Sequence, residues 1–321
     1  MKRIPILLLA ASVLAASLTA CGSPAASSSS AAPSSASSSA AQGYTFTDDL
    51  GRTVTVEQPE RVAALIGSFA DVWCLAGGQS TLAAAAHDAW TSFDLGLSDT
   101  VADLGAVKEP NLEVLLAAQP DFILASCNTT ADLELESTFG SAGIPTAYFD
   151  IQSFDDYLNM LKICTDLTGC PENYETYGLQ VQEQVEAAKA RQDGSAPTVL
   201  TIRATGSSCK VKGSQDFLLG EMLSDLGCVN VADSETSLLE ELSLESILAA
   251  DPDYIFVVLQ GSDATDAQET LEKTLLSNPA WGSLRAVQEG RFHTLEHSLY
   301  NLKPNARWGE AYEKLADILY P

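Results

Sequence analysis

The feature that most constrains the fold of this 321-residue chain is a segment that occurs twice. Residues 112–125 read LEVLLAAQPDFILA, and residues 244–257 read LESILAADPDYIFV. In each copy, leucines at helical spacing lead to a proline, which ends a helix, and then to an apolar run typical of a buried strand. The repeat predicts one helix–turn–strand unit at the same place in two similar halves. Any helix–turn–strand unit could acquire such leucines and a proline independently, but this does not explain the glutamate that both copies share.

Short apolar runs alternate with helical stretches through both halves, after a hairpin predicted at residues 44–56. The predicted strands are 62–66, 82–86, 122–125 and 146–149 in the first half, and 198–202, 254–259 and 292–295 in the second. The predicted helices are 71–76, 112–118, 133–139, 217–226, 244–250 and 306–319. This alternation favours an α/β fold of two Rossmann-like lobes with parallel-rich sheets. Ligands bind beyond the carboxyl ends of such strands, so we expect a cleft between the lobes.

A different kind of segment joins the two halves. Gly169 ends one helix, Pro171 suits the first turn of the next, and residues 173–192 contain no helix breaker except Gly178. Twenty helical residues span about 30 Å, the width of a small domain. The predicted organisation is a signal peptide (1–20), a tether (21–42), a first lobe (43–168), an interlobe helix (169–194) and a second lobe (195–321).

The chain is strongly acidic. Its 17 Lys and Arg residues stand against 43 Asp and Glu residues, which gives a formal net charge of −26. Nucleic acid is therefore excluded as a partner, because phosphate backbones require a basic surface. Six cysteines follow Cys21 without zinc-type spacing, and we interpret most of them as small buried residues. Cys164 with Cys170, and Cys209 with Cys228, are the disulfide pairings to check.

The N-terminus predicts export and anchoring. Lys2 and Arg3 precede the apolar run 4–18, which is typical of a secretory signal. The following Leu-Thr-Ala-Cys resembles the bacterial lipobox, whose cysteine, here Cys21, is lipidated after cleavage; an ordinary signal peptide is the alternative. Residues 22–42 are nearly all Ser, Ala and Pro, a composition typical of a flexible tether. We therefore expect an extracytoplasmic protein, anchored by lipid to the outer face of the cytoplasmic membrane.

Several segments in order resemble one family. DDLGRTVTVEQPERVAAL near the start, the two repeated segments, the central helix and the ending that begins NPAWGSLRAVQEGRFHTLEHSLYNLKPNARW are similar to class III bacterial solute-binding proteins. That family delivers iron–siderophores, haem or cobalamin to ABC importers. The resemblance implies a monomer without a cofactor or catalytic activity, whose partners are a permease and its ATPase. It also implies that Glu113 and Glu245 dock on permease arginines; both glutamates instead suit a first-turn role that complements the helix dipole.

Candidate ligand-binding residues follow the predicted strands. Arg203 and Lys210, with Lys212 nearby, form a basic cluster in an acidic chain, which favours an anionic group such as a carboxylate, a catecholate or a haem propionate. Phe69, Trp90 and Tyr300 suit the apolar walls of a site for a ring ligand, although each suits the core equally well. The predicted set is Ser68, Phe69, His87, Trp90, Asn128, Arg203, Lys210, His297, Tyr300 and Asn301.

Other functions leave weaker signals. His87 and His297 with Asp88 offer ligands for a bare zinc or manganese ion, and a single histidine offers an axial haem ligand. His293 lies early in its strand and is interpreted as structural. No GxSxG, P-loop or GxGxxG motif follows a predicted strand, so a surface-anchored hydrolase is a remote alternative. We predict no catalytic residues and no resident metal.

Overall fold

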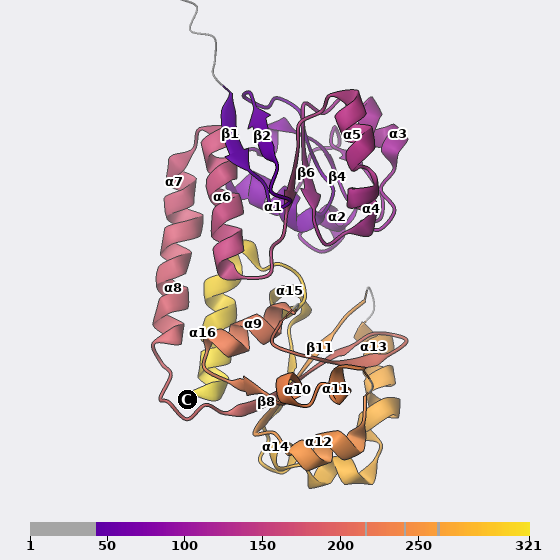
Figure 1. Ribbon diagram of the computed structural model, residues 1–321, viewed down its shortest axis with the longest axis vertical. Helices are drawn as coiled ribbons and strands as arrows, with labels where there is room; N and C mark the ends of the chain where they lie inside the picture. Colours follow the sequence, from indigo (N-terminus) through magenta and orange to yellow (C-terminus); the bar gives the residue numbers. More distant parts are fainter. Residues whose placement is uncertain (1–42, 216, 241, 262–263) are drawn as a thin grey trace, which may run out of the picture. The chain divides into compact units, whose positions relative to one another are not determined.

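The computed structural model describes residues 43–321 except 216, 241 and 262–263 (Figure 1). The predicted signal peptide, tether and lipidated Cys21 therefore lie outside the described residues. The predicted hairpin is present as β1 (Tyr44–Thr47) and β2 (Thr53–Val56), which pair antiparallel. Among the described residues, no helix is both long enough and apolar enough to cross a membrane.

The first sheet is parallel, with the strand order β5-β4-β3-β6-β7. Its strands are β3 (Val62–Ala64), β4 (Leu82–Ala85), β5 (Ala102–Asp103), β6 (Phe122–Ser126) and β7 (Thr146–Phe149). The helices and 3-10 turn between them are α1 (Gly67–Leu75), η1 (Gln79–Thr81), α2 (Asp88–Thr91), α3 (Leu112–Ala117), α4 (Thr130–Glu134) and α5 (Glu136–Ala142). Every residue of β3, β4, β6 and β7 is buried, as expected for parallel strands covered on both faces.

The second sheet has the parallel order β10-β8-β11-β12, and β9 pairs antiparallel with β8. Its strands are β8 (Thr198–Ala204), β9 (Cys209–Lys212), β10 (Val229–Asn230), β11 (Tyr254–Leu259) and β12 (Phe292–Leu295). The helical segments are α9 (Leu218–Asp225), α10 (Val231–Ser234), α11 (Ser237–Glu240), α12 (Leu244–Ala250), α13 (Ala264–Leu271), η3 (Glu272–Leu276), η4 (Pro279–Ser283), α14 (Arg285–Gln288), α15 (His297–Tyr300), η5 (Asn305–Arg307) and α16 (Trp308–Leu319). The predicted α/β fold with parallel sheets is thus confirmed.

The repeated segments form α3–β6 and α12–β11. β6 pairs with β3, the first strand of its sheet, and β11 pairs with β8, the first strand of the other, so the two copies occupy equivalent places. The residue before each proline has a positive φ, 49° at Gln119 and 39° at Asp251, which turns the chain from helix into strand.

The aspartate of each Pro-Asp pair also has an equivalent role. Asp121 accepts hydrogen bonds from the backbone N–H groups of Glu60 and Arg61, at 2.9 and 3.0 Å. Asp253 accepts from the backbone N–H and the hydroxyl of Thr198, at 2.9 and 2.7 Å. Each carboxylate therefore fixes the start of the first strand of its sheet to the repeated turn.

Long helices connect the halves. α6 (Phe154–Thr168) begins with a capping box in which Ser153 and Asp156 satisfy each other's backbone N–H groups. The predicted helix over 173–192 is present as α7 (Pro171–Tyr174), a π-helical turn η2 (Glu175–Leu179) and α8 (Gln180–Lys189), and α16 packs along α8 (Figure 1). The largest buried cluster runs from Val54 to Leu319 and so takes side chains from both halves of the sequence.

Candidate ligand-binding site

In both sheets the strand order reverses beside the first strand. β3 lies between β4 and β6, and β8 lies between β10 and β11, so successive connections leave in opposite directions. Open parallel sheets bind ligands beyond the carboxyl ends of the two strands at such a reversal. The positions that this rule selects are the residues after β3 and β6 in the first sheet, and after β8 and β11 in the second.

A pocket lies at the reversal of the second sheet. Its volume is about 670 Å³, within the range of small-molecule sites. The lining residues are Lys108, Arg203, Thr205, Gly206, Ser207, Ser208, Lys210, Gln260 and Gly261. We call this the cationic pocket, because its described lining contains three cations and no carboxylate. Lys108 comes from the segment between β5 and α3 in the first half of the chain, and the sequence analysis did not identify it.

The two predicted basic residues were expected after a strand, but both lie within strands. Arg203 belongs to β8, residues 209–212 form β9, and Lys210 lies directly opposite Arg203 in the β8–β9 pairing. The alternation Cys-Lys-Val-Lys, buried at Cys209 and Val211, was the available signal for this strand. Like charges facing each other across a strand pair repel, which makes the site attractive to an anion.

The cations of the pocket have no acidic partners within the described part of the chain. Elsewhere, described cations such as Arg52, Arg191 and Arg307 form ion pairs with carboxylates. By contrast, the side chains of Lys108, Arg203 and Lys210 have no hydrogen-bond or ion-pair partner among the described residues. Hydroxyl groups complete the pocket: Thr205 Oγ1 lies 3.2 Å from Ser208 Oγ and accepts from the Ser208 backbone N–H at 3.0 Å. These groups suit the oxygen atoms of a carboxylate, phenolate or phosphate.

Predicted residues of the first half lie at or near the other strand ends. Asn128 follows β6, is exposed, and donates to Asp150 Oδ1 at 2.5 Å. His87, between β4 and α2, pairs through Nδ1 with Asp103 Oδ2 at 2.7 Å. Partial burial raises the pKa of the Asp103 carboxyl, but hydrogen bonds from Gly105 and His87 outweigh that effect and lower it. Trp90 on α2 is half-buried and packs against the largest buried cluster.

Three predicted ligand residues lie inside the protein instead of on its surface. Ser68 and Phe69, at the start of α1, are 2% and 1% exposed, and Tyr300 is 1% exposed. Phe69 packs edge-on against Phe149, and the Tyr300 hydroxyl donates to the Ala311 carbonyl at 3.0 Å. Phe69 and Tyr300 thus occupy the core positions that their sequence also suited, and the Ser68 hydroxyl is buried without a hydrogen-bond partner among the described residues. We do not include them in the proposed site.

Among the described residues, the three histidines do not form a metal site with the acids. His297 and Asn301, after β12, lie 3.1 Å apart through Nε2 and Nδ2, and burial lowers the pKa of His297. His293 stacks on Phe256 with ring centroids 5.6 Å apart, consistent with the structural role expected for it. Asp88 accepts from the Gly67 backbone N–H at 2.9 Å. Among the described residues, no three His, Cys, Asp or Glu side chains are placed to hold a metal ion.

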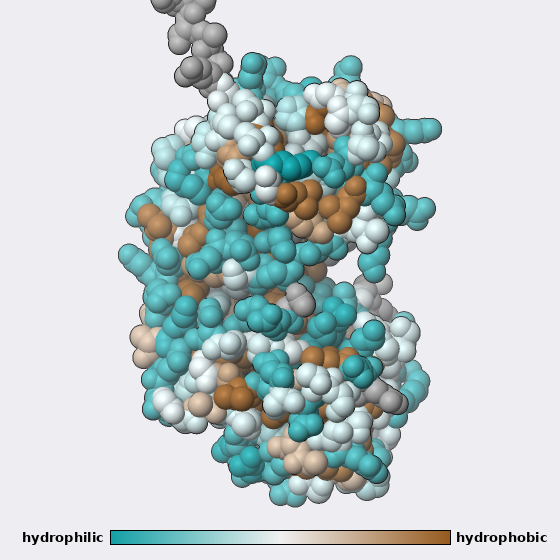
Figure 2. Space-filling view, viewed as in Figure 1, coloured by the Kyte–Doolittle hydropathy of each residue, from teal (hydrophilic) through white to brown (hydrophobic). Residues whose placement is uncertain are grey.

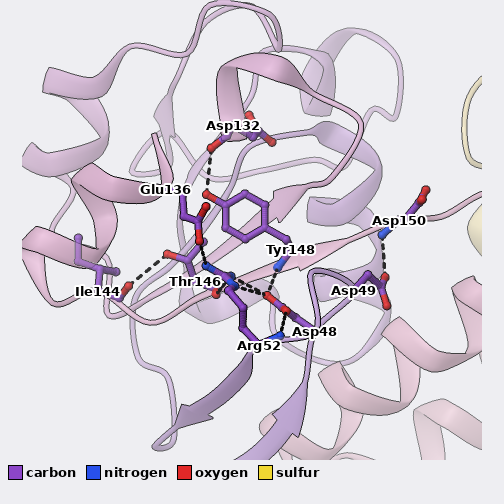
Figure 3. A network of polar contacts seen from close by, with 9 residues as sticks. All are labelled: Asp48, Asp49, Arg52, Asp132, Glu136, Ile144, Thr146, Tyr148 and Asp150. Carbon is purple, nitrogen blue, oxygen red and sulfur yellow. Dashed lines mark hydrogen bonds and ion pairs between the residues drawn. The ribbon is translucent and has the colours of Figure 1, made fainter. Parts of the chain in front are cut away.

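A polar network joins the hairpin turn to β7 and to α5 (Figure 3). The Arg52 guanidinium lies 4.6 Å from the Tyr148 ring centroid, pairs with Asp48 at 2.6 Å and pairs with Glu136 at 2.8 Å. The Tyr148 hydroxyl donates to the Asp132 carbonyl at 2.9 Å.

Asp132 is the most unusual acid of this network. Its side chain is 0% exposed; Oδ2 accepts from the Ser126 backbone N–H at 2.8 Å, and Oδ1 has no hydrogen-bond partner among the described residues. Burial raises the pKa of Asp132 to about 7. The carboxyl supports the turn between β6 and α4, and that turn carries Asn128.

The exposed surface offers two kinds of contact. Figure 2 shows mostly polar residues on the face in view, with apolar residues in small patches, one of them in the area of α4. Glu113 and Glu245 are exposed in the first turns of α3 and α12, at equivalent positions. The side chains of Asn111 and Ser243 cap these helices, so neither glutamate is the capping residue.

The six cysteines after Cys21 are all free, including the two pairs singled out for disulfides.

Each half thus contains a largely parallel sheet of reversed strand order, helices link the halves, and a polar pocket lies at one reversal. A family model described as periplasmic binding protein matches residues 62–299. The chain therefore belongs to the periplasmic binding protein family, as its resemblance implied.

Individual relatives agree with that assignment. The chain is 26% identical to the iron-uptake system-binding protein of Bacillus subtilis, over 68% of this chain and 67% of that one. It is 25% identical to the ferric-anguibactin-binding protein of Vibrio anguillarum, over 79% and 83%. The solved structure of the siderophore-binding protein BauB, bound to acinetobactin and ferric iron, has the same fold, with a TM-score of 0.69, 19% identity, and coverage of 87% of this chain and 99% of that one.

Proposed function

We propose that this protein captures a ferric siderophore or a related metal chelate outside the cell and delivers it to an ABC importer. The single observation that carries the ligand class is the cationic pocket, in which Lys108, Arg203 and Lys210 lack acidic partners among the described residues. Anionic oxygen atoms of a chelate would pair with these cations. The names of two relatives, which refer to iron uptake and to a ferric chelate, support the same class.

The remaining predicted ligand residues fit this proposal as secondary contacts. His87, Trp90 and Asn128 come from the first half, and His297 and Asn301 come from the second. Trp90 is the one tryptophan of four that is not buried, so its emission is the natural reporter of a bound chelate. A haem or cobalamin ligand remains an alternative, because an aromatic wall and cations for propionates or phosphate serve those molecules as well.

The experiment titrates the purified protein with ferric siderophores of catecholate, hydroxamate and carboxylate type, with haem, with cobalamin, and with zinc and manganese salts, and follows tryptophan emission. We expect saturable quenching by an anionic ferric chelate, weakened at least about tenfold in Arg203→Ala and Lys108→Ala. Arg291→Ala is the matched control, since Arg291 pairs with Glu289 and does not line the pocket. A response to bare metal alone, or equal affinity in all three variants, would reject the proposal.

Catalysis is not part of the proposed function. The family's role is binding, and the pocket's described lining contains no histidine or carboxylate. ATP hydrolysis would belong to the importer. Recovery of the bound ligand unchanged after prolonged incubation tests this statement, and a surface hydrolase would instead release a product.

Placement at the membrane is a further part of the proposal. A lipid on Cys21 and the Ser/Ala/Pro-rich segment 22–42 would hold the folded part near its importer. Replacement of Cys21 by Ser is expected to release the protein from the membrane fraction into the medium, with ligand affinity unchanged. Retention of the variant at the membrane would contradict the anchor.

A further inference from the structure

A buried asparagine in the segment that follows α15 is hydrogen-bonded to the first half of the chain. Asn305 is 1% exposed and donates through Nδ2 to the Ser68 carbonyl at 2.9 Å and to Asp71 Oδ2 at 2.8 Å. These partners lie on α1, 237 and 234 positions away in sequence. The two N–H groups of one amide thus link the end of the second half to the first helix of the first half.

The backbone at Asn305 is specialised for this contact. Its φ is +49°, in the left-handed region, which costs free energy for residues other than glycine and is tolerated best by asparagine and aspartate. A buried side chain held by two hydrogen bonds offsets that cost. The conformation therefore indicates that Asn305 serves through its side-chain hydrogen bonds and not through local helix formation.

Neighbours of Asn305 reach the same half by other means. Trp308 is 0% exposed and packs against Phe154 of α6 with ring centroids 5.8 Å apart. Burial lowers the pKa of Lys303, and the carboxylates of Asp150 and Asp156 oppose that effect. Hydrogen bonding and ring packing thus hold residues 305–308 against the first half.

Each end of this link adjoins predicted ligand residues. On one side, His297 and Asn301 precede Asn305 by eight and four positions. On the other, α1 lies against α2, which bears Trp90: the Gly67 N–H donates to Asp88 Oδ1 at 2.9 Å, and a Cβ on Gly67 would stand 2.6 Å from the Ala89 nitrogen. A shift of α1 would therefore be transmitted to α2.

We propose that Asn305 is a positioning residue that fixes the distance between the ligand-binding residues of the two halves. The inference rests on the proposed function only in treating those residues as ligand-binding. While Asn305 is bonded to Ser68 and Asp71, the ligand-binding residues of the two halves should keep a fixed distance. When those hydrogen bonds are lost, the two groups of residues should move apart.

The test uses the ligand-free protein, so its outcome does not depend on which ligand is bound. Asn305→Gly keeps the left-handed backbone accessible and removes only the side-chain bonds, and it is expected to fold. Asn305→Asp places a carboxylate against the Ser68 carbonyl and Asp71, and it should have the larger effect. Asn230→Ala is the matched control, because Asn230 is also buried but bonds Thr201 and Lys212 within the second half.

Amide hydrogen exchange and small-angle X-ray scattering supply the two readouts. We expect exchange at residues 67–71 and 297–301 to rise about tenfold in Asn305→Gly, the scale of losing a buried hydrogen bond, together with a larger radius of gyration. Asn230→Ala should lower the unfolding midpoint without increasing the radius. Wild-type scattering in both Asn305 variants, or exchange that rises uniformly in proportion to lost stability, would overturn the proposal.

Discussion

Arg203 and Lys210 face each other across β8 and β9, and both line the cationic pocket together with Lys108. Cross-strand like charges destabilise a strand pair by about 0.2–1 kcal/mol. The ligand-free protein therefore sustains a local repulsion that an anionic ligand would relieve.

Removing one of the two charges should stabilise the empty protein. In Lys210→Thr, we expect the free energy of unfolding in urea to rise by about 0.5 kcal/mol while affinity for an anionic chelate falls. Lys212→Thr is the control on the same strand, because Lys212 lies opposite Thr201 and not opposite a cation. A loss of stability in Lys210→Thr would show that the two cations do not repel.

Asp132 should make stability depend on pH in the direction opposite to most carboxylates. Its pKa rises from 3.8 to about 7 on folding, so folding takes up a proton between those values, and stability falls as pH increases through this window. Asp132→Asn keeps an acceptor for Ser126 and cannot ionise. At pH 8, the free energy of unfolding of the variant should exceed that of wild type by about 1–3 kcal/mol, since the unpartnered amide offsets part of the gain. Below pH 4, the variant should gain nothing relative to wild type.

Chemical denaturation of both proteins from pH 4 to pH 8 measures this effect. Glu134→Gln, an exposed acid on the same helix, serves as the control. A stability difference between Asp132→Asn and wild type that stays constant across the range would mean that Asp132 is ionised throughout.

The two Pro-Asp turns should respond alike to mutation. Asp121→Asn and Asp253→Asn each replace a carboxylate that binds the start of a first strand, and each is expected to cost about 1–2 kcal/mol of unfolding free energy. Asp99→Asn, on an exposed loop, should cost nothing measurable. An effect at one turn only would show that the repeat is not energetically equivalent.

The Asp253 contribution should fade in acid. Partial burial raises the pKa of Asp253, but hydrogen bonds from Thr198 and the charges of Arg285 and Arg291 lower it overall. Its stabilisation is thus present above the ordinary Asp pKa and is lost as pH falls through the lowered value. The stability difference between Asp253→Asn and wild type, measured by denaturation at pH 3 and pH 6, should accordingly be smaller at pH 3.

The exposed glutamates Glu113 and Glu245 should affect delivery and not capture. In cells that take up the ligand through this protein, the double variant Glu113→Gln, Glu245→Gln is expected to lower uptake at least about tenfold, because each lost charged pair costs about 1 kcal/mol or more. Ligand affinity of the purified variant should match wild type. Undiminished uptake would favour the helix-dipole role for both residues.

Much of the fold could be predicted because its signals are local. β7, β11 and β12 begin and end where the apolar runs do, and the repeat correctly places β6 and β11. The two-residue strands β5 and β10 were missed because such short pairings leave no periodicity. The long predicted helix contains a π-helical turn around Gly178, which spacing alone does not reveal.

The candidate site was harder to predict because its parts are brought together only by folding. Arg203 and Lys210 could be identified from the scarcity of positive charge in the sequence. Lys108 is far from both in sequence and has no local signal. Phe69 and Tyr300 follow strands as lining residues do, yet burial assigns them to the core.

The buried cluster that extends from Val54 to Leu319 has a consequence for how this molecule can be divided. Cleavage of the chain within α8 would leave each fragment with an incomplete hydrophobic core, because α16, near the C-terminal end, packs against that helix. Neither fragment should fold alone, whereas the two mixed together should reassemble. The two halves, each of which carries one copy of the repeated segment, are thus complementary parts of one cooperative folding unit.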